Sequence, residues 1–205
     1  MGGRLITIEG IDGAGKSTLA RALQAELERD RPVRLLREPG GVELSERIRA
    51  LVTDPTVRCD PRAEALLYAA ARAQLVDERL APWLDEGTWV LLDRFVDSSL
   101  AYQGGGRSLG IDAIAALNGF ATGGLSPDRT LLLRIDPATA RARRGDAPDR
   151  LEREQDSFFE KITAAYDELA ARNPERIRVL DAADPPHVVL HGALDALADL
   201  HCPRS

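Results

Sequence analysis

The sequence predicts an α/β fold with three layers, in which a five-stranded parallel sheet is flanked by helices on both faces. Five short apolar runs are spread over the 205 residues, and longer stretches with apolar residues at helical spacing separate them. Strands that alternate with helices in this way form parallel sheets. Each helix carries the chain back to the end of the sheet at which the previous strand began, so the next strand runs in the same direction. No linker divides the chain, so we expect a single domain over residues 1–205.

Each expected strand is followed by polar residues or by Gly or Pro. The five ranges are residues 5–8, 33–36, 89–92, 130–135 and 176–180. Ligands of parallel α/β sheets bind at the carboxyl ends of the strands, so the polar residues at these positions are the first candidates for a site.

The longest expected helix covers about residues 61–86, between the second and third strands. It is amphipathic, and its apolar side is expected to lie in the core. The residues on that side are Ala65, Leu66, Ala69, Leu75, Val76 and Leu80.

Composition and charge limit the class of protein. Apolar residues make up 44% of the chain, and no apolar run approaches the ~18 residues of a membrane span. The net charge of −6 argues against a broad nucleic-acid surface. The first residues already read as strand and loop, which is not the pattern of a signal peptide. Cys59 and Cys202 lack metal-ligand spacing, so we expect free thiols and a cytoplasmic location.

Residues 10–18 carry the phosphate-binding pattern G-x-x-x-x-G-K-[ST], between an expected strand and an expected helix. Glycines let backbone N–H groups approach a triphosphate, and the helix N-terminus adds partial positive charge. Lys16 would reach the β- and γ-phosphates, and the Ser17 hydroxyl would bind Mg²⁺. We therefore expect a P-loop NTPase fold whose nucleotide is held by Gly10, Ile11, Asp12, Gly13, Ala14, Gly15, Lys16, Ser17 and Thr18.

Asp93 and Arg94 follow the third expected strand, beside the phosphate loop. The Asp93 carboxylate is placed to orient the Mg²⁺ shell, and the Arg94 guanidinium can neutralise two facing phosphates; the alternative is a salt bridge at a surface turn. Asp12 is unusual in a phosphate loop, because a carboxylate repels phosphate unless it faces another partner. A ribose hydroxyl or an arginine would serve, and a solvent-facing side chain is the alternative.

Side chains suited to a flat base and a second phosphate lie on three further segments. Tyr68 and Arg72 share one helix face and could hold a base with carbonyl oxygens, or could form only an intrahelical cation–π contact. Residues 98–107 place hydroxyl, amide and phenol groups before three glycines, and Gln103 can both donate to and accept from a pyrimidine edge. Arg49 lies on a helix with an apolar face, where a lone arginine ordinarily faces solvent.

The most polar interruption of the chain covers residues 144–154. A dense charged stretch is ordinarily a solvated loop, but its place between two helices also suits a lid that closes over phosphates. We expect this lid segment to cover about residues 143–154.

With these motifs the sequence resembles the thymidylate kinase family over nearly the whole chain. The phosphate loop is shared with many unrelated NTPases, whereas two other motifs are much more specific: residues 66–72 (LLYAAAR), and residues 93–95 (DRF) with 98–104 (SSLAYQG). Residues 37–41 (REPGG) and 149–152 (DRLE) also match. The chain departs from the family pattern at Ala71, where a polar residue is usual, and at Phe95, where Tyr or His is usual.

The resemblance implies phosphoryl transfer from ATP to dTMP, giving ADP and dTDP, with Mg²⁺. It implies a homodimer and no nucleic-acid or membrane partner. Matching residues by position, the catalytic set would be Lys16, Asp93, Arg94, Arg144 and Arg150. The metal would be held by Ser17 and Asp93, and ATP would also contact Arg143 and Ala182. The dTMP site would comprise Asp12, Glu38, Pro39, Arg49, Tyr68, Arg72, Arg94, Ser99, Tyr102 and Gln103.

Three other functions fit parts of the sequence. A kinase for another nucleoside monophosphate, or for a deoxynucleoside, would share the phosphate loop. A GTP-hydrolysing switch would need a guanine-reading motif such as N-K-x-D, which the sequence lacks. A noncatalytic nucleotide-binding module would leave the acceptor residues Arg49, Tyr68, Arg72 and Gln103 unexplained.

Overall fold

The computed structural model describes residues 2–143, 150–151 and 153–201. Its sheet has five parallel strands, as the sequence predicts, and their order is β2–β3–β1–β4–β5. The strands are β1 (Arg4–Glu9), β2 (Val33–Arg37), β3 (Trp89–Asp93), β4 (Arg129–Arg134) and β5 (Ile177–Asp181). Each observed end lies within one residue of the predicted end. In β2 the strand is longer than predicted because Arg37 continues the ladder and pairs with Asp93.

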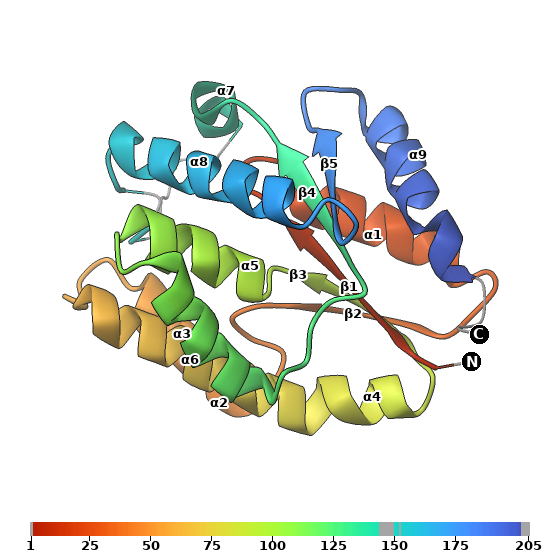
Figure 1. The fold of residues 1–205 in the computed structure, drawn as a ribbon, viewed down its shortest axis with the longest axis horizontal. Coiled ribbons are helices and arrows are strands. Elements are labelled where there is room, and N and C mark those ends of the chain that lie inside the picture. Colours follow the sequence, from red (N-terminus) through yellow and green to blue (C-terminus); the bar gives the residue numbers. More distant parts are fainter. Residues whose placement is uncertain (1, 144–149, 152, 202–205) are drawn as a thin grey trace.

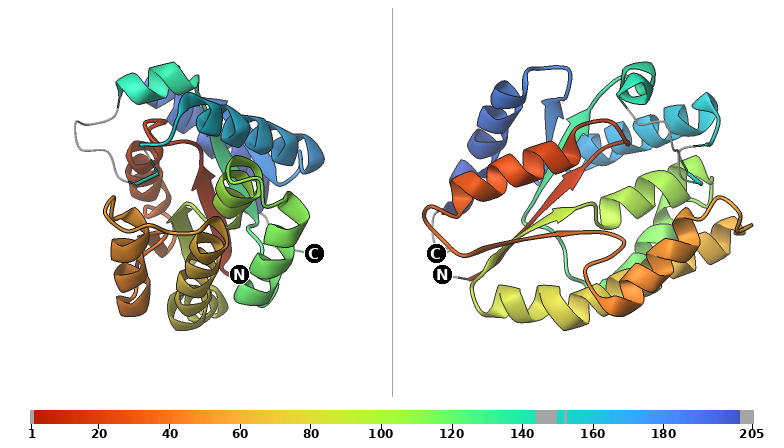
Figure 2. Two further views of the ribbon diagram at one scale, coloured as in Figure 1. Left: turned by 90° about the vertical axis from the view of Figure 1, so that its left-hand side faces the viewer. Right: turned by 180° about the vertical axis from the view of Figure 1, so that it is seen from behind.

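Helices cover both faces of the sheet, which completes the three predicted layers (Figures 1 and 2). Helices α1 (Lys16–Leu27) and α9 (Pro186–Leu197) pack together on one face. The other face is covered by the remaining helical segments: α2 (Glu43–Thr53), α3 (Pro61–Leu75), α4 (Ala81–Asp85), α5 (Val96–Ser99), α6 (Ile111–Thr122), α7 (Pro137–Ala142), α8 (Asp156–Arg172) and the π-helical turns Val76–Leu80 and Leu100–Gly106. A short 3₁₀ helix, Ala198–His201, follows α9.

The segment expected as one helix over residues 61–86 is helical over nearly that range. It begins where the Asp60 carboxylate accepts the backbone N–H of Arg62 at 2.9 Å, with Pro61 in the first turn. The placement of Leu66 in the core is wrong, because that side chain is 58% exposed. The buried side of α3 contains Glu64 and Arg72 instead, and an apolar pattern does not reveal buried charges.

The carboxyl ends of β1, β2 and β3 bring three loops together at one edge of the sheet. This is the edge at which the sequence predicts a site. Elsewhere Cys59 is a free thiol, as expected, and Cys202 lies outside the described residues. No helix in the described part of the chain is long and apolar enough to cross a membrane.

Candidate active site

The phosphate loop connects β1 to α1 and is held against the neighbouring backbone. Gly10, Gly13 and Gly15 have φ values of 137°, 89° and 93°, which L side chains rarely adopt. A Cβ on Gly10 would also collide with the carbonyl of Leu133, and one on Gly13 with the carbonyl of Ala140. These two glycines are therefore required by the packing of the loop on β4 and α7, in addition to any approach of a phosphate.

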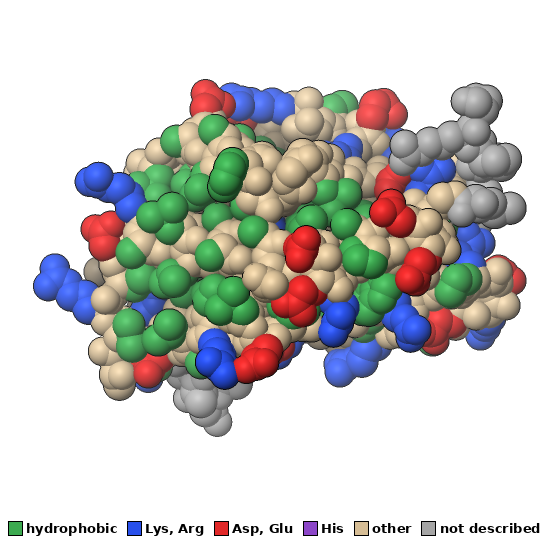
Figure 3. All heavy atoms as spheres, turned by 90° about the horizontal axis from the view of Figure 1, so that it is seen from below, with side chains coloured by type: hydrophobic (Ala, Val, Ile, Leu, Met, Phe, Trp, Pro, Cys, Tyr) green, Lys and Arg blue, Asp and Glu red, His purple; other side chains and the backbone are tan. Residues whose placement is uncertain are grey.

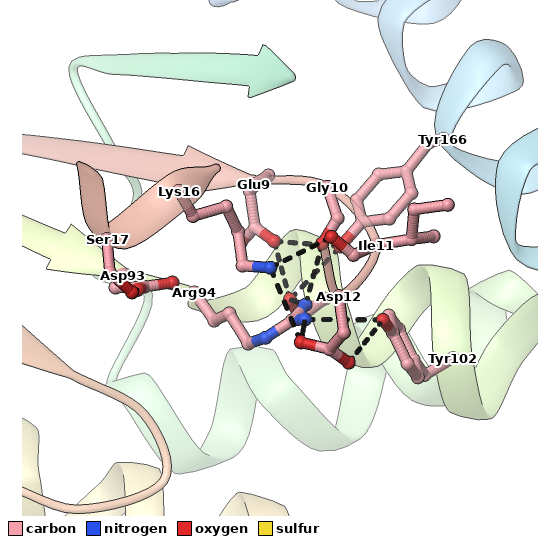
Figure 4. Close-up of polar contacts among 11 residues, drawn as sticks. Glu9, Gly10, Ile11, Asp12, Lys16, Ser17, Asp93, Arg94, Tyr102 and Tyr166 are labelled. Atoms are coloured by element: carbon pink, nitrogen blue, oxygen red, sulfur yellow. Dashed lines mark hydrogen bonds and ion pairs between the residues drawn. The ribbon is translucent and has the colours of Figure 1, made fainter. Parts of the chain in front are cut away.

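Lys16 is buried at the start of α1, with its ammonium group inside the loop. Its Nζ donates to the carbonyl of Ile11 at 3.0 Å and lies 3.5 Å from the Asp12 carboxylate (Figure 4). Burial, and next the nearby Arg94, lower the pKa of Lys16 below its usual value, while neighbouring carboxylates oppose the shift. A bound polyanion would add negative charge beside this buried cation, whose present ionic contact is Asp12 at 3.5 Å.

Ser17 and Asp93 meet at the N-terminus of α1, where the Ser17 hydroxyl donates to the Asp93 carboxylate at 2.8 Å. Both offer the hard oxygen ligands that Mg²⁺ prefers. The described residues contain no cluster of three or more metal-binding side chains. The pair therefore fits a Mg²⁺ ion that takes most of its ligands from phosphate and water.

Arg94 holds the junction between the loop and β3. Its backbone lies in the left-handed region, with φ of 73°. Its guanidinium donates to the carbonyl of Gly10 at 2.9 Å and to the Asp12 carboxylate at 2.6 Å (Figure 4). Burial lowers the pKa of Arg94, but Asp12 and neighbouring Tyr102 outweigh it, so the net shift is upward. Of the partners considered for Asp12, the structure provides the arginine.

Glu9 lies behind this junction and was missed as a functional candidate. It is fully buried, and its carboxylate accepts hydrogen bonds from Phe95 N (2.8 Å), Ser98 Oγ (2.5 Å) and Tyr166 Oη (2.9 Å). Burial, and next the charge of Asp97, raise the pKa of Glu9 to about 7. Because Phe95 and Ser98 follow Arg94 in sequence, Glu9 fixes the backbone that presents the Arg94 side chain.

Arg72 lies at the base of a second cavity, buried beside Glu38. Its Nε donates to Glu38 at 2.8 Å, and its NH2 lies 2.6 Å from the same carboxylate oxygen. The other hydrogens are directed to Ser99, to the side chain of Asn118 and to the carbonyl of Phe95. All five N–H groups of Arg72 thus have protein partners, and a base carbonyl would have to share one of them.

The two departures from the family pattern have local explanations. The Phe95 ring is fully buried, with the guanidinium of Arg72 5.4 Å from its centre, so Phe95 supports Arg72 through its ring and its carbonyl. Ala71 is also buried, and its carbonyl accepts the Ser45 hydroxyl at 2.6 Å. A methyl group fits this position, where α3 packs on α2.

The second cavity brings together the side chains expected to bind dTMP. Arg49 is half-buried and lines the cavity, and it donates to the carbonyl of Pro39 at 3.2 Å. Gln103 donates to Glu64 at 2.8 Å. The lining contains all ten expected residues and three more: Asp12, Glu38, Pro39, Arg49, Thr53, Tyr68, Arg72, Arg94, Ser98, Ser99, Tyr102, Gln103 and Leu151.

Of the three arginines expected near the lid, the structure describes two, and these two lie beside different cavities. Arg143 lines the cavity around the phosphate loop and donates to the carbonyl of Ala182 at 2.8 Å. Arg150 instead contacts Glu64 at 2.7 Å and the carbonyl of Val52 at 2.8 Å, on the side of the second cavity. Arg144 lies outside the described residues.

The cavity around the phosphate loop has a volume of about 630 Å³ and continues into the second cavity. Four residues line both: Asp12, Glu38, Arg49 and Arg94. Two of the four are arginines, which suits a point where two anionic groups meet. The fold and the site together define a P-loop kinase that acts on a small, phosphate-bearing acceptor.

Comparison with known proteins identifies the family. The family profile of thymidylate kinase matches residues 8–191. A thymidylate kinase of Alkalilimnicola ehrlichii is 48% identical over 203 residues, which cover 96% of this chain and 93% of that protein. The corresponding protein of Halorhodospira halophila is 46% identical over 205 residues, which cover 97% and 95%. A crystal structure of thymidylate kinase from Ehrlichia chaffeensis matches with a TM-score of 0.82 at 28% identity, covering 97% of this chain and all of that one. The chain belongs to the thymidylate kinase family.

Proposed function

We propose that the two joined cavities hold ATP and dTMP with their phosphates meeting at Arg94, in an enzyme that supplies dTDP for dTTP biosynthesis. As a thymidylate kinase, the chain phosphorylates dTMP to dTDP with ATP as the donor. The observation that carries the proposed arrangement is that Asp12, Glu38, Arg49 and Arg94 line both cavities.

In this arrangement the donor cavity binds ATP. Backbone N–H groups of residues 10–18 surround the β- and γ-phosphates, and Lys16 neutralises them. Ser17 and Asp93, 2.8 Å apart, hold Mg²⁺, which neutralises phosphate charge when it is bound. Arg143 and Ala182, joined by a hydrogen bond at the far side of the cavity, flank the nucleotide.

The acceptor cavity binds dTMP. Tyr68 presents an aromatic ring from α3, while Ser99 and Gln103 bound the base edge. Arg49 and Arg94 hold the phosphate at the junction. The remaining lining residues assigned to the acceptor are Asp12, Glu38, Pro39, Arg72 and Tyr102.

The chemistry requires positioning and positive charge more than acid–base catalysis. The dTMP phosphate is already ionised near neutral pH and is itself the nucleophile, so no general base is needed. The transferred group spreads negative charge over its equatorial oxygens, and the cations Lys16 and Arg94 face that charge. Glu9 acts indirectly, by fixing the backbone of residues 95–98 behind Arg94.

Residues 143–154 form the lid of this single-domain kinase in our proposal. Closure would exclude water, which otherwise hydrolyses ATP. Arg144 and Arg150 are proposed to stabilise the transferring group from the lid. For Arg150 this requires exchange of its present partner Glu64 for phosphate.

We further propose that the enzyme is a cytoplasmic homodimer that pairs through α2, α3 and α6. These adjacent helices each expose a large apolar side chain: Leu51 is 51% exposed, Leu66 58% and Phe120 90%. Figure 3 views this side of the molecule and shows hydrophobic side chains spread across it. Exposed apolar side chains on one face are typical of protein interfaces, and none of these three side chains lines either cavity.

Release of ADP in the presence of different acceptors tests the proposal. We expect rapid ADP release with dTMP, far slower release with dCMP or thymidine, and almost none without an acceptor. A nucleotide-dependent switch would instead hydrolyse its nucleotide without an acceptor. Equal rates with and without dTMP would contradict the proposal.

A further inference from the structure

Glu64 is a buried carboxylate whose only part in the reaction described above is as the present partner of Arg150. It lies in the first turn of α3 and is fully excluded from solvent. Four N–H contacts converge on its two oxygens. Gln103 Nε2 lies 2.8 Å and Arg107 Nε 3.3 Å from Oε1, while Arg107 NH2 lies 3.1 Å and Arg150 NH2 2.7 Å from Oε2.

The two guanidinium groups determine what Glu64 can offer Gln103. Arg107 donates to both oxygens of Glu64 and Arg150 to one of them, and a guanidinium group can only donate. Both oxygens of Glu64 therefore act as acceptors. Gln103 must in turn present a donor to Glu64.

This requirement fixes the orientation of the Gln103 amide. The amide has a donor end, Nε2, and an acceptor end, Oε1, and only Nε2 can face Glu64. Gln103 is 2% exposed and lines the acceptor cavity. Its Oε1 makes no hydrogen bond to any residue in the described part of the chain, so the cavity is left with an unpaired acceptor.

We propose that Glu64 is a positioning residue for base selectivity, which holds the carbonyl oxygen of Gln103 toward the acceptor base. This proposal rests on the dTMP site described above. A thymine or uracil ring carries a hydrogen on N3 and can donate it to Gln103 Oε1. Cytosine has an unprotonated N3 at the same place, so two acceptors would face each other, and an unpaired buried polar group is costly.

Glu64→Gln tests this orientation with little change in shape. A glutamine at this position can donate through its own amide, so Gln103 can turn over and present Nε2 to the base. We compare the KM for dTMP with the inhibition constant of dCMP as a competitor, because the latter is measurable without turnover. The ratio of the dCMP inhibition constant to the dTMP KM is expected to fall at least about tenfold in this variant. The KM for ATP is expected to stay the same.

Glu154→Gln is the matched control. Glu154 is the other carboxylate bound to Arg107, at 2.6 Å, and it does not contact Gln103. The same change of Glu to Gln there should leave the selectivity ratio unaltered, whatever its effect on the turnover rate, because Glu154 is the last residue of the proposed lid. If the role of Glu64 is purely structural, Glu64→Gln should weaken the binding of dTMP and of dCMP equally. The selectivity ratio would then be unchanged, which would overturn the proposal.

Gln103→Met covers the case in which Glu64→Gln does not fold. It removes both ends of the amide while leaving Glu64 between its arginines, and it should also lower the ratio about tenfold. Retention of full selectivity by Gln103→Met would overturn the proposal. If the wild-type protein phosphorylates dTMP and the variants keep their selectivity, the role of Glu64 is wrong and the proposed function stands. If the wild-type protein does not phosphorylate dTMP, the proposed function itself is wrong.

Discussion

The Arg94 guanidinium lies 2.6 Å from the Asp12 carboxylate, at the point where the donor and acceptor cavities join. This ion pair explains how an acidic residue can belong to a phosphate loop, because the arginine offsets its charge. It also orients the guanidinium, which donates to the carbonyl of Gly10 at 2.9 Å as well. Arg94 is thus held by the phosphate loop and, through longer contacts, by Ser98 at 3.1 Å and Tyr102 at 3.3 Å.

Arg94→Ala is expected to lower kcat/KM for dTMP by at least about 3 kcal/mol of transition-state stabilisation, or more than about a hundredfold. The loss arises because Arg94 is one of two arginines that line both cavities, and Arg49 reaches them from a different element, α2. Steady-state kinetics with both substrates varied measures it. Arg34→Ala, on β2 with its guanidinium 5.8 Å from the Trp83 ring, is the control and should retain activity. An Arg94→Ala rate within a few-fold of the wild type would contradict the role.

Arg72→Ala is expected mainly to raise the KM for dTMP, because Arg72 lines the proposed base pocket and does not line the cavity around the phosphate loop. The change also leaves Glu38 buried without its cation, so the free energy of unfolding should fall by about 3–5 kcal/mol. Urea unfolding measures this loss, and Arg72→Ala combined with Glu38→Gln should recover part of it. An unchanged KM would count against the pocket assignment.

The raised pKa of Glu9 predicts a pH-dependent stability. In the folded state the pKa of Glu9 is about 7, whereas the ordinary pKa of a glutamate, which applies to the unfolded state, is 4.5. Between pH 4.5 and about 7 the folded state therefore binds more protons than the unfolded state. The free energy of unfolding of the wild type, relative to Glu9→Gln, should therefore fall by about 3 kcal/mol as pH rises from about 4 to about 8. Urea titrations of both proteins across this range measure the difference. A constant difference would show that Glu9 titrates normally.

Ser17→Ala is expected to raise the Mg²⁺ concentration for half-maximal activity about tenfold, because it removes one oxygen of the proposed metal pair. Ser17→Thr keeps the hydroxyl and should stay close to the wild type. The measurement is a Mg²⁺ titration at fixed ATP and dTMP. If Ser17→Ala and Ser17→Thr respond alike, the hydroxyl does not bind the metal.

Phe120→Asp is expected to shift the protein from dimer to monomer in sedimentation velocity, because a charge would be buried in the proposed α2–α3–α6 interface. Val188→Asp is the control: Val188 is 41% exposed on α9, away from these helices. If the Phe120→Asp variant sediments as the wild type does, this interface is excluded.

The sheet and the phosphate loop could be predicted from the sequence because each is marked by a pattern of neighbouring residues. Apolar runs located the five strands, and glycine spacing located the loop. Leu66 was misplaced because the buried side of α3 is defined partly by Glu64 and Arg72, whose partners are distant in sequence. Glu9 and Tyr166, 157 residues apart, show the same limit: no local pattern predicts a buried polar contact of that separation.

A crystal structure with dTMP bound tests the central claim most directly. We predict electron density for the base beside Tyr68 and Gln103, with the phosphate against Arg49 and Arg94 at the junction of the two cavities. Density for dTMP in the phosphate loop alone, or at a surface site remote from Arg94, would contradict the account.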